Sequence, residues 1–150
     1  MTSLNMPILR RASAEDWDAV RDLLRASDLP TEDLGPDRLD GFLIAEDDGV
    51  IVGLIGLELL GDVGLLRSLV VEKKARRAGL GSKLVGALES AAETAGVTEL
   101  WLLTIDAQDF FQRHNYEIVS RETAPESVRG SEEFSALCPD TAYLMCKSLG

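Results

Sequence analysis

The segment from residue 70 to residue 84 most constrains the fold, because it joins three kinds of local sequence without a break. An apolar stretch ends at Val71, a basic turn with two glycines follows, and an amphipathic pattern starts at Leu80. Gly79 and Gly81 carry no Cβ atom, so the backbone can approach a ligand closely there. The helix predicted after them adds N–H groups and a partial positive charge at its first turn. The segment therefore predicts a strand–turn–helix unit whose turn binds a phosphate or pyrophosphate.

Positive charge gathers around this turn although the chain as a whole is acidic. Four basic residues lie there: Lys73, Lys74, Arg76 and Arg77. The net charge of the chain is −11, so this concentration is local. Glycines before a helix also occur in tight turns that bind nothing, and on the glycine pair alone both interpretations stand. The basic cluster favours the anion site.

The overall composition fits a single soluble domain over residues 1–150. Hydrophobic residues make up 45% of the chain and charged residues 27%, and a chain of this length buries a core without disulfides or metals. The acidic balance argues against nucleic acid or an anionic membrane as the main partner, because both need a broad basic surface. The scarcity of lysines beside so many acids is compatible with a high-salt cytosol.

Cysteine and histidine usage argues against a metal site. Cys138 and Cys146 lack metal-ligand spacing, and His114 is the only histidine in the sequence. The N-terminus lacks the apolar run of a signal peptide, and no stretch is long and apolar enough to cross a bilayer. We therefore expect a cytoplasmic protein with reduced thiols and no membrane segment.

Apolar periodicity and turn signals predict the order of secondary structure. A short strand at residues 8–9 is followed by a helix whose cap is Ser13-Ala14-Glu15-Asp16. Later strands are predicted at residues 42–45, 50–60, 65–71, 100–105, 116–119 and 142–146. The first three of these would be antiparallel, with turns at Asp48-Gly49 and Gly61-Asp62. A short helix is expected through residues 110–111, and a helical turn at residues 132–137.

The helix after the glycine turn should end at Gly96 and lead into a strand parallel to residues 65–71. Its predicted buried face comprises Leu80, Leu84, Leu88, Ala91 and Ala95. This order of elements predicts an α+β domain with a mixed sheet.

Two known nucleotide-binding motifs do not match this sequence. A dinucleotide fingerprint would need a glycine where Leu84 stands, and Gly81-Ser82-Lys83 reverses the order of lysine and hydroxyl in a nucleotide-hydrolase phosphate loop.

The pattern Arg76-x-x-Gly79-x-Gly81, set between an apolar strand and an amphipathic helix, resembles motif A of the GNAT N-acetyltransferase superfamily. The resemblance covers nearly the whole chain. It implies an antiparallel N-terminal meander, helices on both faces of the sheet, and splayed fourth and fifth strands. It also implies that acetyl-coenzyme A binds with its pyrophosphate on the backbone of the turn and its pantetheine arm along the fourth strand. The implied cofactor contacts are Leu69, Val70, Val71, Arg76, Arg77, Ala78, Gly79, Leu80, Gly81 and Ser82.

The same resemblance implies direct attack of a neutral amine on the thioester. The backbone N–H of Val71 would stabilise the developing oxyanion, and the thiolate would be protonated as it leaves. Two positions depart from the pattern of many relatives: Thr104 stands where they have Asn, and Phe111 where they have a Tyr acid. Tyr116, Tyr143 and Cys138 could donate a proton by their chemistry, although packing is the commoner role of such residues.

Two narrower resemblances point to amino-acid acceptors. Leu103-Thr104 followed by Asp109-Phe110-Phe111-x-Arg113 is similar to the acetyltransferase domain of N-acetylglutamate synthases. The C-terminal sequence resembles the arsenic-resistance N-acetyltransferase family at Ala124-Pro125, Glu133-Phe134, Leu137-Cys138-Pro139, Ala142 and Met145. We therefore expect an acetyl-CoA-dependent N-acetyltransferase whose acceptor is a small amino acid or an amino-acid-like toxin, such as an arsenic or phosphinate analogue of glutamate.

Candidate acceptor residues lie on the strands beside the predicted thioester site. Arg67 could hold an anionic group of the acceptor, or it could simply pair with Glu58 on the neighbouring strand. Ser68 and Thr104 could also contact the acceptor, and Glu58 is a candidate general base. The polar segment with Arg129, Glu132 and Glu133 would form a wall of that site.

Two other functions remain open at this point. The chain could acetylate a protein lysine or N-terminus, or it could be a non-catalytic sensor that binds acetyl-CoA. The absence of a tyrosine at Phe111 is the main support for a sensor. Because dimers are common in this superfamily, a homodimer is a further expectation.

Overall fold

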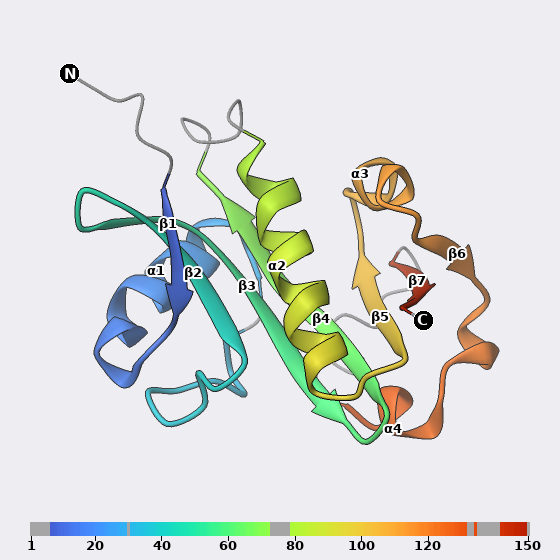
Figure 1. Ribbon diagram of the computed structural model, residues 1–150. Coiled ribbons are helices and arrows are strands. Elements are labelled where there is room, and N and C mark those ends of the chain that lie inside the picture. The colour runs from blue at the N-terminus through green and yellow to red at the C-terminus, as the bar shows by residue number, and fades with distance from the viewer. Residues whose placement is uncertain (1–6, 30, 73–78, 132–133, 135–141, 150) are drawn as a thin grey trace. The chain divides into compact units, whose positions relative to one another are not determined.

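The computed structural model describes residues 7–29, 31–72, 79–131, 134 and 142–149. Its strands are β1 (Ile8–Arg11), β2 (Phe42–Asp47), β3 (Val50–Leu60), β4 (Val63–Val71), β5 (Glu99–Thr104), β6 (Glu117–Val119) and β7 (Tyr143–Ser148). Its α-helices are α1 (Trp17–Ala26), α2 (Leu80–Thr94), α3 (Gln108–Arg113) and α4 (Glu126–Arg129), and single 3₁₀ turns cover Ala14–Asp16 and Arg121–Thr123. The strands follow the order β1-β2-β3-β4-β5-β7-β6 in a mixed seven-stranded sheet, which confirms the predicted α+β class (Figure 1).

The chain divides into two compact units. The first unit comprises Met1–Gly56 and Ser68–Leu88, and the second comprises Leu57–Arg67 and Glu89–Gly150. The boundaries fall inside β3, β4 and α2, so each of these elements contributes residues to both units.

In the first unit, β1 pairs antiparallel with β2, and β2 pairs antiparallel with β3. The predicted hairpin between β2 and β3 is confirmed, because Asp47 pairs with Val50 across Asp48-Gly49. Both turn residues are left-handed, with φ of 51° at Asp48 and 81° at Gly49. This conformation matches the right-handed twist of the two strands, which is why Asp-Gly is a strong hairpin signal.

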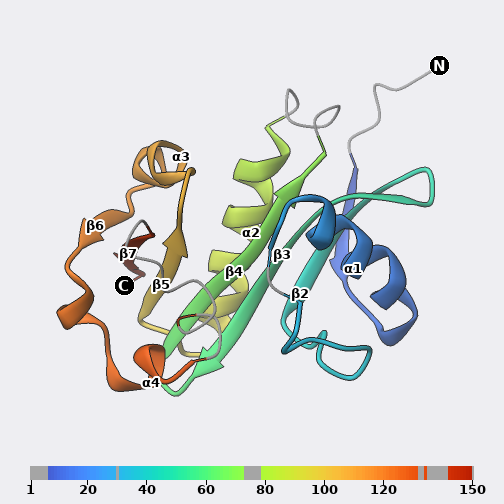
Figure 2. The same cartoon turned by 180° about the vertical axis from the view of Figure 1, so that it is seen from behind.

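Helices cover both faces of the sheet within the first unit, as predicted. Val20 and Leu24 of α1 pack in one apolar cluster with Leu54 of β3, and Trp17 packs against this cluster. A Cβ atom added to the adjacent Gly53 would lie 3.2 Å from Leu84 Cδ1 of α2. Because neighbouring strand residues face opposite sides, α1 and the start of α2 lie on opposite faces. Figures 1 and 2 show these two faces, with α2 in front in Figure 1 and α1 in front in Figure 2.

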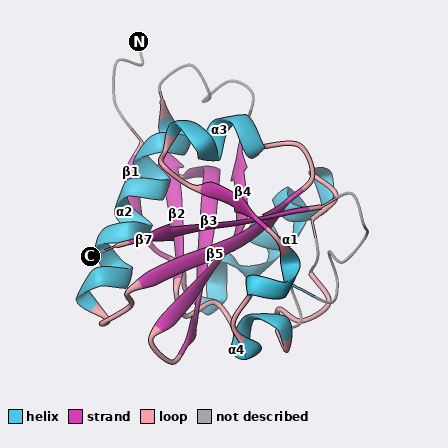
Figure 3. Ribbon diagram, turned by 90° about the vertical axis from the view of Figure 1, so that its right-hand side faces the viewer, coloured by secondary structure: helices cyan, strands magenta, loops and turns pink. Residues whose placement is uncertain are grey.

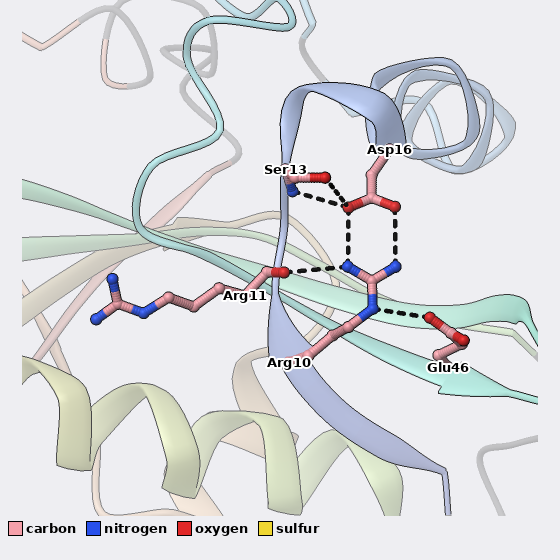
Figure 4. Close-up of polar contacts among 5 residues, drawn as sticks. All are labelled: Arg10, Arg11, Ser13, Asp16 and Glu46. Atoms are coloured by element: carbon pink, nitrogen blue, oxygen red, sulfur yellow. Dashed lines mark hydrogen bonds and ion pairs between the residues drawn. The ribbon is translucent and has the colours of Figure 1, made fainter.

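A network of charged side chains fixes the start of α1 in the first unit (Figure 4). Arg10 donates hydrogen bonds to both carboxylate oxygens of Asp16, at 3.0 and 2.9 Å, and a third to Glu46 Oε1 at 2.8 Å. Asp16 also accepts a hydrogen bond from the backbone N–H of Ser13 at 2.8 Å. The hydrogen bonds from Arg10 hold the pKa of the Asp16 carboxyl below its ordinary value. The predicted cap is therefore present, although it precedes a 3₁₀ turn and the α-helix itself begins at Trp17.

In the second unit, β4 pairs parallel with β5, as the sequence predicts. Their described ladder joins Val63–Leu65 to Glu99–Trp101 and ends there. β7 pairs antiparallel with both β5 and β6. Figure 3 shows β5 and β7 side by side, with α3 above them and α4 below. The splay of the carboxyl halves of β4 and β5 stays a prediction, because Ser68–Val71 belongs to the first unit.

The face of β5 that carries Trp101 and Leu103 is covered within the second unit. Trp101 and Leu103 form an apolar cluster with Val128 of α4. On β7, Lys147 is the register partner of Leu100, and its ammonium group pairs with Glu89 of α2 at 3.0 Å. Trp101 is buried, and its indole N–H donates a hydrogen bond to Glu99 Oε1 at 3.2 Å.

Several predicted boundaries and one predicted helix face need correction. β4 begins at Val63, two residues before the predicted start, and β5 ends at Thr104, which leaves Ile105 exposed. Ala91 and Ala95 of the predicted buried face are exposed, and Ala92 is buried instead. The buried face continues the four-residue spacing of the leucines, so it reaches position 92.

The C-terminal part of the chain departs most from the sequence prediction. The 3₁₀ turn at Arg121–Thr123 and helix α4 at Glu126–Arg129 were not predicted. The helical turn expected at residues 132–137 lies, except for residue 134, outside the described residues. Among the helices that the structure describes, none has the length and apolar character needed to cross a bilayer.

Candidate active site

The carboxyl half of β4, in the first unit, contains an unusual backbone conformation. Ser68 has φ of 62°, in the left-handed region, although it lies in the middle of a strand and is not a glycine. Its side chain is buried. A left-handed conformation costs a non-glycine residue roughly 1–2 kcal/mol, and such outliers cluster at ligand-binding and active sites.

The predicted pantetheine-binding residues follow directly after Ser68. Val70 and Val71 have buried side chains, and Leu69 is half-buried. Directly after β4, the Glu72 N–H donates to the Val52 carbonyl of β3 at 2.9 Å. The role predicted for the Val71 N–H stays a prediction.

The glycine turn ends as the sequence predicts, with a helix starting directly after Gly79. Gly79 has φ of 69°, and α2 begins at Leu80. The Lys83 N–H donates to the Gly79 carbonyl at 3.2 Å, so Gly79 is bonded into the first turn of the helix. A Cβ atom at Gly79 would meet no atom within 4 Å, so the backbone conformation, and not space within the protein, requires a glycine.

The first turn of α2 is buried on its apolar side and exposed to solvent on the other. Leu80 is fully buried, whereas Gly81 is half-buried and Ser82 is exposed. The amino end of a helix presents N–H groups and a partial positive charge. Of the other predicted phosphate-binding residues, Arg76, Arg77 and Ala78 lie outside the described residues.

In the second unit, Glu58 of β3 and Arg67 of β4 form an ion pair. Arg67 Nη1 lies 3.6 Å from Glu58 Oε1, a distance too long for a good hydrogen bond. The Arg67 side chain is 3% exposed and the Glu58 side chain 37%. Glu58 Oε1 is nevertheless buried and has no hydrogen-bond partner. The pairing that the sequence left open is therefore present, and an acceptor-binding role for either residue stays a prediction.

The carboxyl end of β5 leads into a turn held by Thr104. Thr104 is buried, and its Oγ1 accepts a hydrogen bond from the Ala107 N–H at 3.0 Å. Helix α3 begins at the next residue, Gln108, whose Oε1 is a second buried oxygen without a partner. Sequence reasoning missed Gln108, since a single glutamine at a helix start belongs to no motif.

Aromatic packing accounts for Phe111 and Tyr116. Phe111 is buried, with its ring edge-to-face against Tyr116 at 5.5 Å between centroids. The Tyr116 hydroxyl donates to Glu89 Oε2 at 2.9 Å, and Lys147 Nζ donates to the same oxygen at 3.0 Å. Burial raises the pKa of Tyr116, and the nearby Glu89 carboxylate raises it further. These contacts give Tyr116 a structural role.

The remaining predicted residues fall outside these clusters. Tyr143 and Arg129 are exposed, and Cys138, Glu132 and Glu133 lie outside the described residues. Within the part of the chain that the structure describes, no group of His, Cys, Asp and Glu side chains could hold a metal ion.

Comparison with known families identifies this arrangement. Residues 7–116 match the acetyltransferase (GNAT) family. The chain belongs to this family. The matched residues include β4, Gly79 at the start of α2, and β5.

Solved structures of GNAT proteins share the fold. N-acetylglutamate synthase from Neisseria gonorrhoeae, complexed with coenzyme A and N-acetyl-glutamate, superposes with a TM-score of 0.82 at 20% identity. This superposition covers 99% of this chain and 36% of that chain. A Mycobacterium tuberculosis protein in complex with CoA superposes with a TM-score of 0.78 at 22% identity, covering 95% of this chain and 99% of that one.

Two curated relatives are similar to this chain over a small share of their own length. Mycothiol acetyltransferase of Actinosynnema mirum is 48% identical over 56 residues, which are 36% of this chain and 19% of the relative. An amino-acid acetyltransferase of Pseudomonas fluorescens is 26% identical over 130 residues, which are 79% of this chain and 29% of the relative. This GNAT chain thus spans less than a third of the length of either relative.

Proposed function

We propose that this GNAT protein is an acetyl-CoA-dependent N-acetyltransferase that acts on the amine of a small amino acid or an amino-acid-like compound. The observation that carries the proposal is the left-handed Gly79 at the start of α2, inside a chain of the GNAT family. The amino end of a helix that follows such a turn can bind an anion through its first N–H groups. In the proposal, residues 76–82 hold the pyrophosphate and residues 69–71 hold the pantetheine arm.

The chemistry proposed for this site is a single transfer step. The amine nitrogen forms a bond to the acetyl carbon as the carbon–sulfur bond breaks, and the electron pair leaves with sulfur. The Val71 N–H stabilises the oxyanion, and Glu58 receives the proton of the amine. Phe111 cannot donate a proton, so the thiolate takes its proton from water.

An amino-acid acceptor has two independent supports. One relative is an amino-acid acetyltransferase, and one structural neighbour was solved with N-acetyl-glutamate. The finer assignment to an arsenic or phosphinate analogue of glutamate, and to the arsenic-resistance family, rests on the C-terminal sequence resemblance alone. A cytoplasmic location and a homodimer also remain predictions.

Thermal unfolding with and without acetyl-CoA tests the cofactor site. We expect acetyl-CoA to raise the melting temperature of the wild type, since a ligand that binds only the folded state stabilises it. Gly79→Val, alone or with Gly81→Val, should abolish this shift. Gly61→Val is the matched control, because Gly61 also has positive φ, here 77°, and open space around its Cβ position. The absence of a shift in the wild type at millimolar cofactor would refute the proposal.

A panel of amino acids, simple amines and peptides, followed by release of free thiol, then identifies the acceptor. Turnover of amino acids supports the proposal, whereas turnover of peptides alone would favour protein acetylation. One specific observation favours an acetyl-CoA sensor instead, namely Phe111 in place of a proton donor. Binding of acetyl-CoA without turnover of any acceptor would favour that second candidate.

A further inference from the structure

We propose that Gly53 of β3 is a positioning residue for the cofactor, because it sets the spacing between the two segments that hold acetyl-CoA in the proposed function. One segment is residues 69–71 of β4, and the other is the start of α2 after Gly79. The inference rests on the proposed function and adds to it a residue that acts through these two segments. All the residues that carry the inference belong to the first unit.

Both cofactor-binding segments meet above Gly53. A Cβ atom at Gly53 would lie 3.2 Å from the Val70 carbonyl oxygen. It would also lie 3.3 Å from Leu80 Cδ2 and 3.2 Å from Leu84 Cδ1, and real Cβ atoms rarely have contacts this short. Val70 is the middle residue of the segment in β4, and Leu80 is the first residue of α2. A single added methyl group would therefore press on both segments at once.

Gly53 is needed for space and not for backbone conformation. It does not have a positive φ, so alanine could adopt the same backbone. In this it is the opposite of Gly79, which has open space around its Cβ position and a φ of 69°. A glycine inside a strand weakens the strand, and it often marks a place where another group approaches closely. At Gly53 the approaching groups are the two cofactor-binding segments.

The face of the sheet below the start of α2 is built from small residues. Gly53 pairs with Ala45 of β2, and residues directly opposite in antiparallel strands share a face. The next pair, Ile44 and Leu54, lies on the other face and packs with α1. The small pair lets α2 lie closer to the sheet than larger side chains would allow.

The neighbours of this glycine have little room to move away. Leu80 and Leu84 are fully buried, and a close-packed interior contains few voids into which they could shift. The Val70 carbonyl belongs to the backbone, and just beyond it the Glu72 N–H is bonded to the Val52 carbonyl of β3. An added methyl group would thus displace the two segments relative to each other by a few tenths of an ångström.

The affinity for the whole cofactor depends on this spacing, because coenzyme A spans both segments. When two linked groups bind two sites, the second binding event gains from the first only if the geometry permits both at once. A fragment that occupies one segment does not depend on the distance to the other. Coenzyme A and its fragments should therefore respond differently to a change at position 53.

Calorimetric titration of the full chain with coenzyme A and two of its fragments tests the inference. We expect Gly53→Ala to raise the Kd of coenzyme A about 10-fold, because a small misplacement weakens the simultaneous fit. Pantetheine lacks the pyrophosphate, and ADP lacks the pantetheine arm. Each fragment should bind the wild type and Gly53→Ala with nearly the same Kd. In assays of thiol release, Gly53→Ala should raise KM for acetyl-CoA and leave KM for the amine unchanged.

Two further variants separate spacing from stability. Gly56→Ala is the matched control, because Gly56 lies in the same strand and its Cβ would meet only the Phe42 ring. It should destabilise the fold and leave the Kd of coenzyme A unchanged below its melting temperature. Gly53→Ala combined with Leu84→Val removes one of the crowded carbon atoms. This double variant should bind coenzyme A with a Kd between those of the wild type and Gly53→Ala.

The outcomes distinguish this inference from the proposed function. If Gly53→Ala leaves the Kd of coenzyme A unchanged, the inference is wrong and the proposed function stands. If the fragments lose as much affinity as coenzyme A does, the spacing role is refuted. If the wild type binds no coenzyme A, the proposed function itself fails. If Gly53→Ala does not fold, the less crowded double variant carries the same comparison between coenzyme A and the fragments.

Discussion

Arg10 makes the densest set of charged contacts described in the first unit. Its guanidinium bridges β1, the 3₁₀ turn before α1 and β2, through Asp16 and Glu46. Because the Arg10 side chain is 40% exposed, solvent screens these pairs. The bidentate geometry with Asp16 offsets part of that screening.

Replacing Arg10 by methionine should therefore lower the free energy of unfolding by about 1 kcal/mol at neutral pH. The depressed pKa of Asp16 means that its contribution is full above the unfolded-state pKa and is lost as pH falls through the folded-state value. Urea unfolding of the wild type and of Arg10→Met should show this difference in the free energy of unfolding at pH 7. The difference should be smaller near pH 3. Arg21→Met is the control, since its partners Asp18 and Asp22 are largely exposed, and it should change stability far less. A difference between wild type and Arg10→Met that grows in acid would contradict the argument.

Ser68 is the clearest case of a residue whose conformation limits its replacement. Its φ of 62° is hardest for a β-branched side chain to adopt. We expect Ser68→Val to lower stability by about 2 kcal/mol or more, whereas Ser68→Gly should stay within about 1 kcal/mol of the wild type, because glycine relieves the strain but gains unfolded-state entropy. Thermal melts of both variants check this. The control is Ser148→Val, at an exposed strand position, which should leave the stability nearly unchanged. If valine lowered the stability equally at both serines, Ser68 would not be strained.

At the scale of single elements, two glycines should respond to alanine in opposite ways. In β3, a Cβ atom on Gly56 would lie 2.7 Å from the buried Phe42 ring, its register partner in β2. The ring must shift, so Gly56→Ala should cost about 1–3 kcal/mol. Gly86 lies within α2, is exposed, and would place its Cβ in open space. Gly86→Ala should stabilise the protein by roughly 0.5–1 kcal/mol. Denaturant titration of the two variants measures the change in the free energy of unfolding for each. If both changes had the same sign, this explanation from packing would be wrong.

The elements with strong local signals could be predicted from the sequence. Asp48-Gly49 has a left-handed backbone in a hairpin turn, and Gly79 has one directly before a helix. Because glycine favours this conformation, both turns could be predicted from the sequence. Long apolar runs likewise indicated β3 and β5. Helix α4 was not predictable, because the four residues of Glu126–Arg129 are too few for a helical period.

The candidate site could be predicted only where backbone conformation follows from residue type. Ser68 gave no signal, since serine is not a residue that requires positive φ. Glu58 and Arg67 could be placed on neighbouring strands, but the long ion pair and the orphaned oxygen depend on tertiary packing. The same holds for Gln108, whose burial no local pattern reveals.

At the scale of the whole molecule, the net charge of −11 opposes both folding and the binding of an anionic cofactor. Salt shortens the range of this repulsion, from about 10 Å at 0.1 M to about 3 Å at 1 M. We expect the melting temperature to rise as NaCl is added over this range. A series with sucrose separates the effect of charge from that of solvent exclusion. A fall in melting temperature would mean that ion pairs such as Arg10–Asp16 outweigh the general repulsion.

The two tryptophans of the sequence lie in different units, Trp17 in the first and Trp101 in the second. Trp17→Phe and Trp101→Phe therefore each leave a single fluorophore, and each reports on one part of the polypeptide alone. Coincident emission changes during denaturation would mean that residues 1–150 melt in one cooperative transition, whereas separate midpoints would reveal a partly unfolded intermediate with only one half intact.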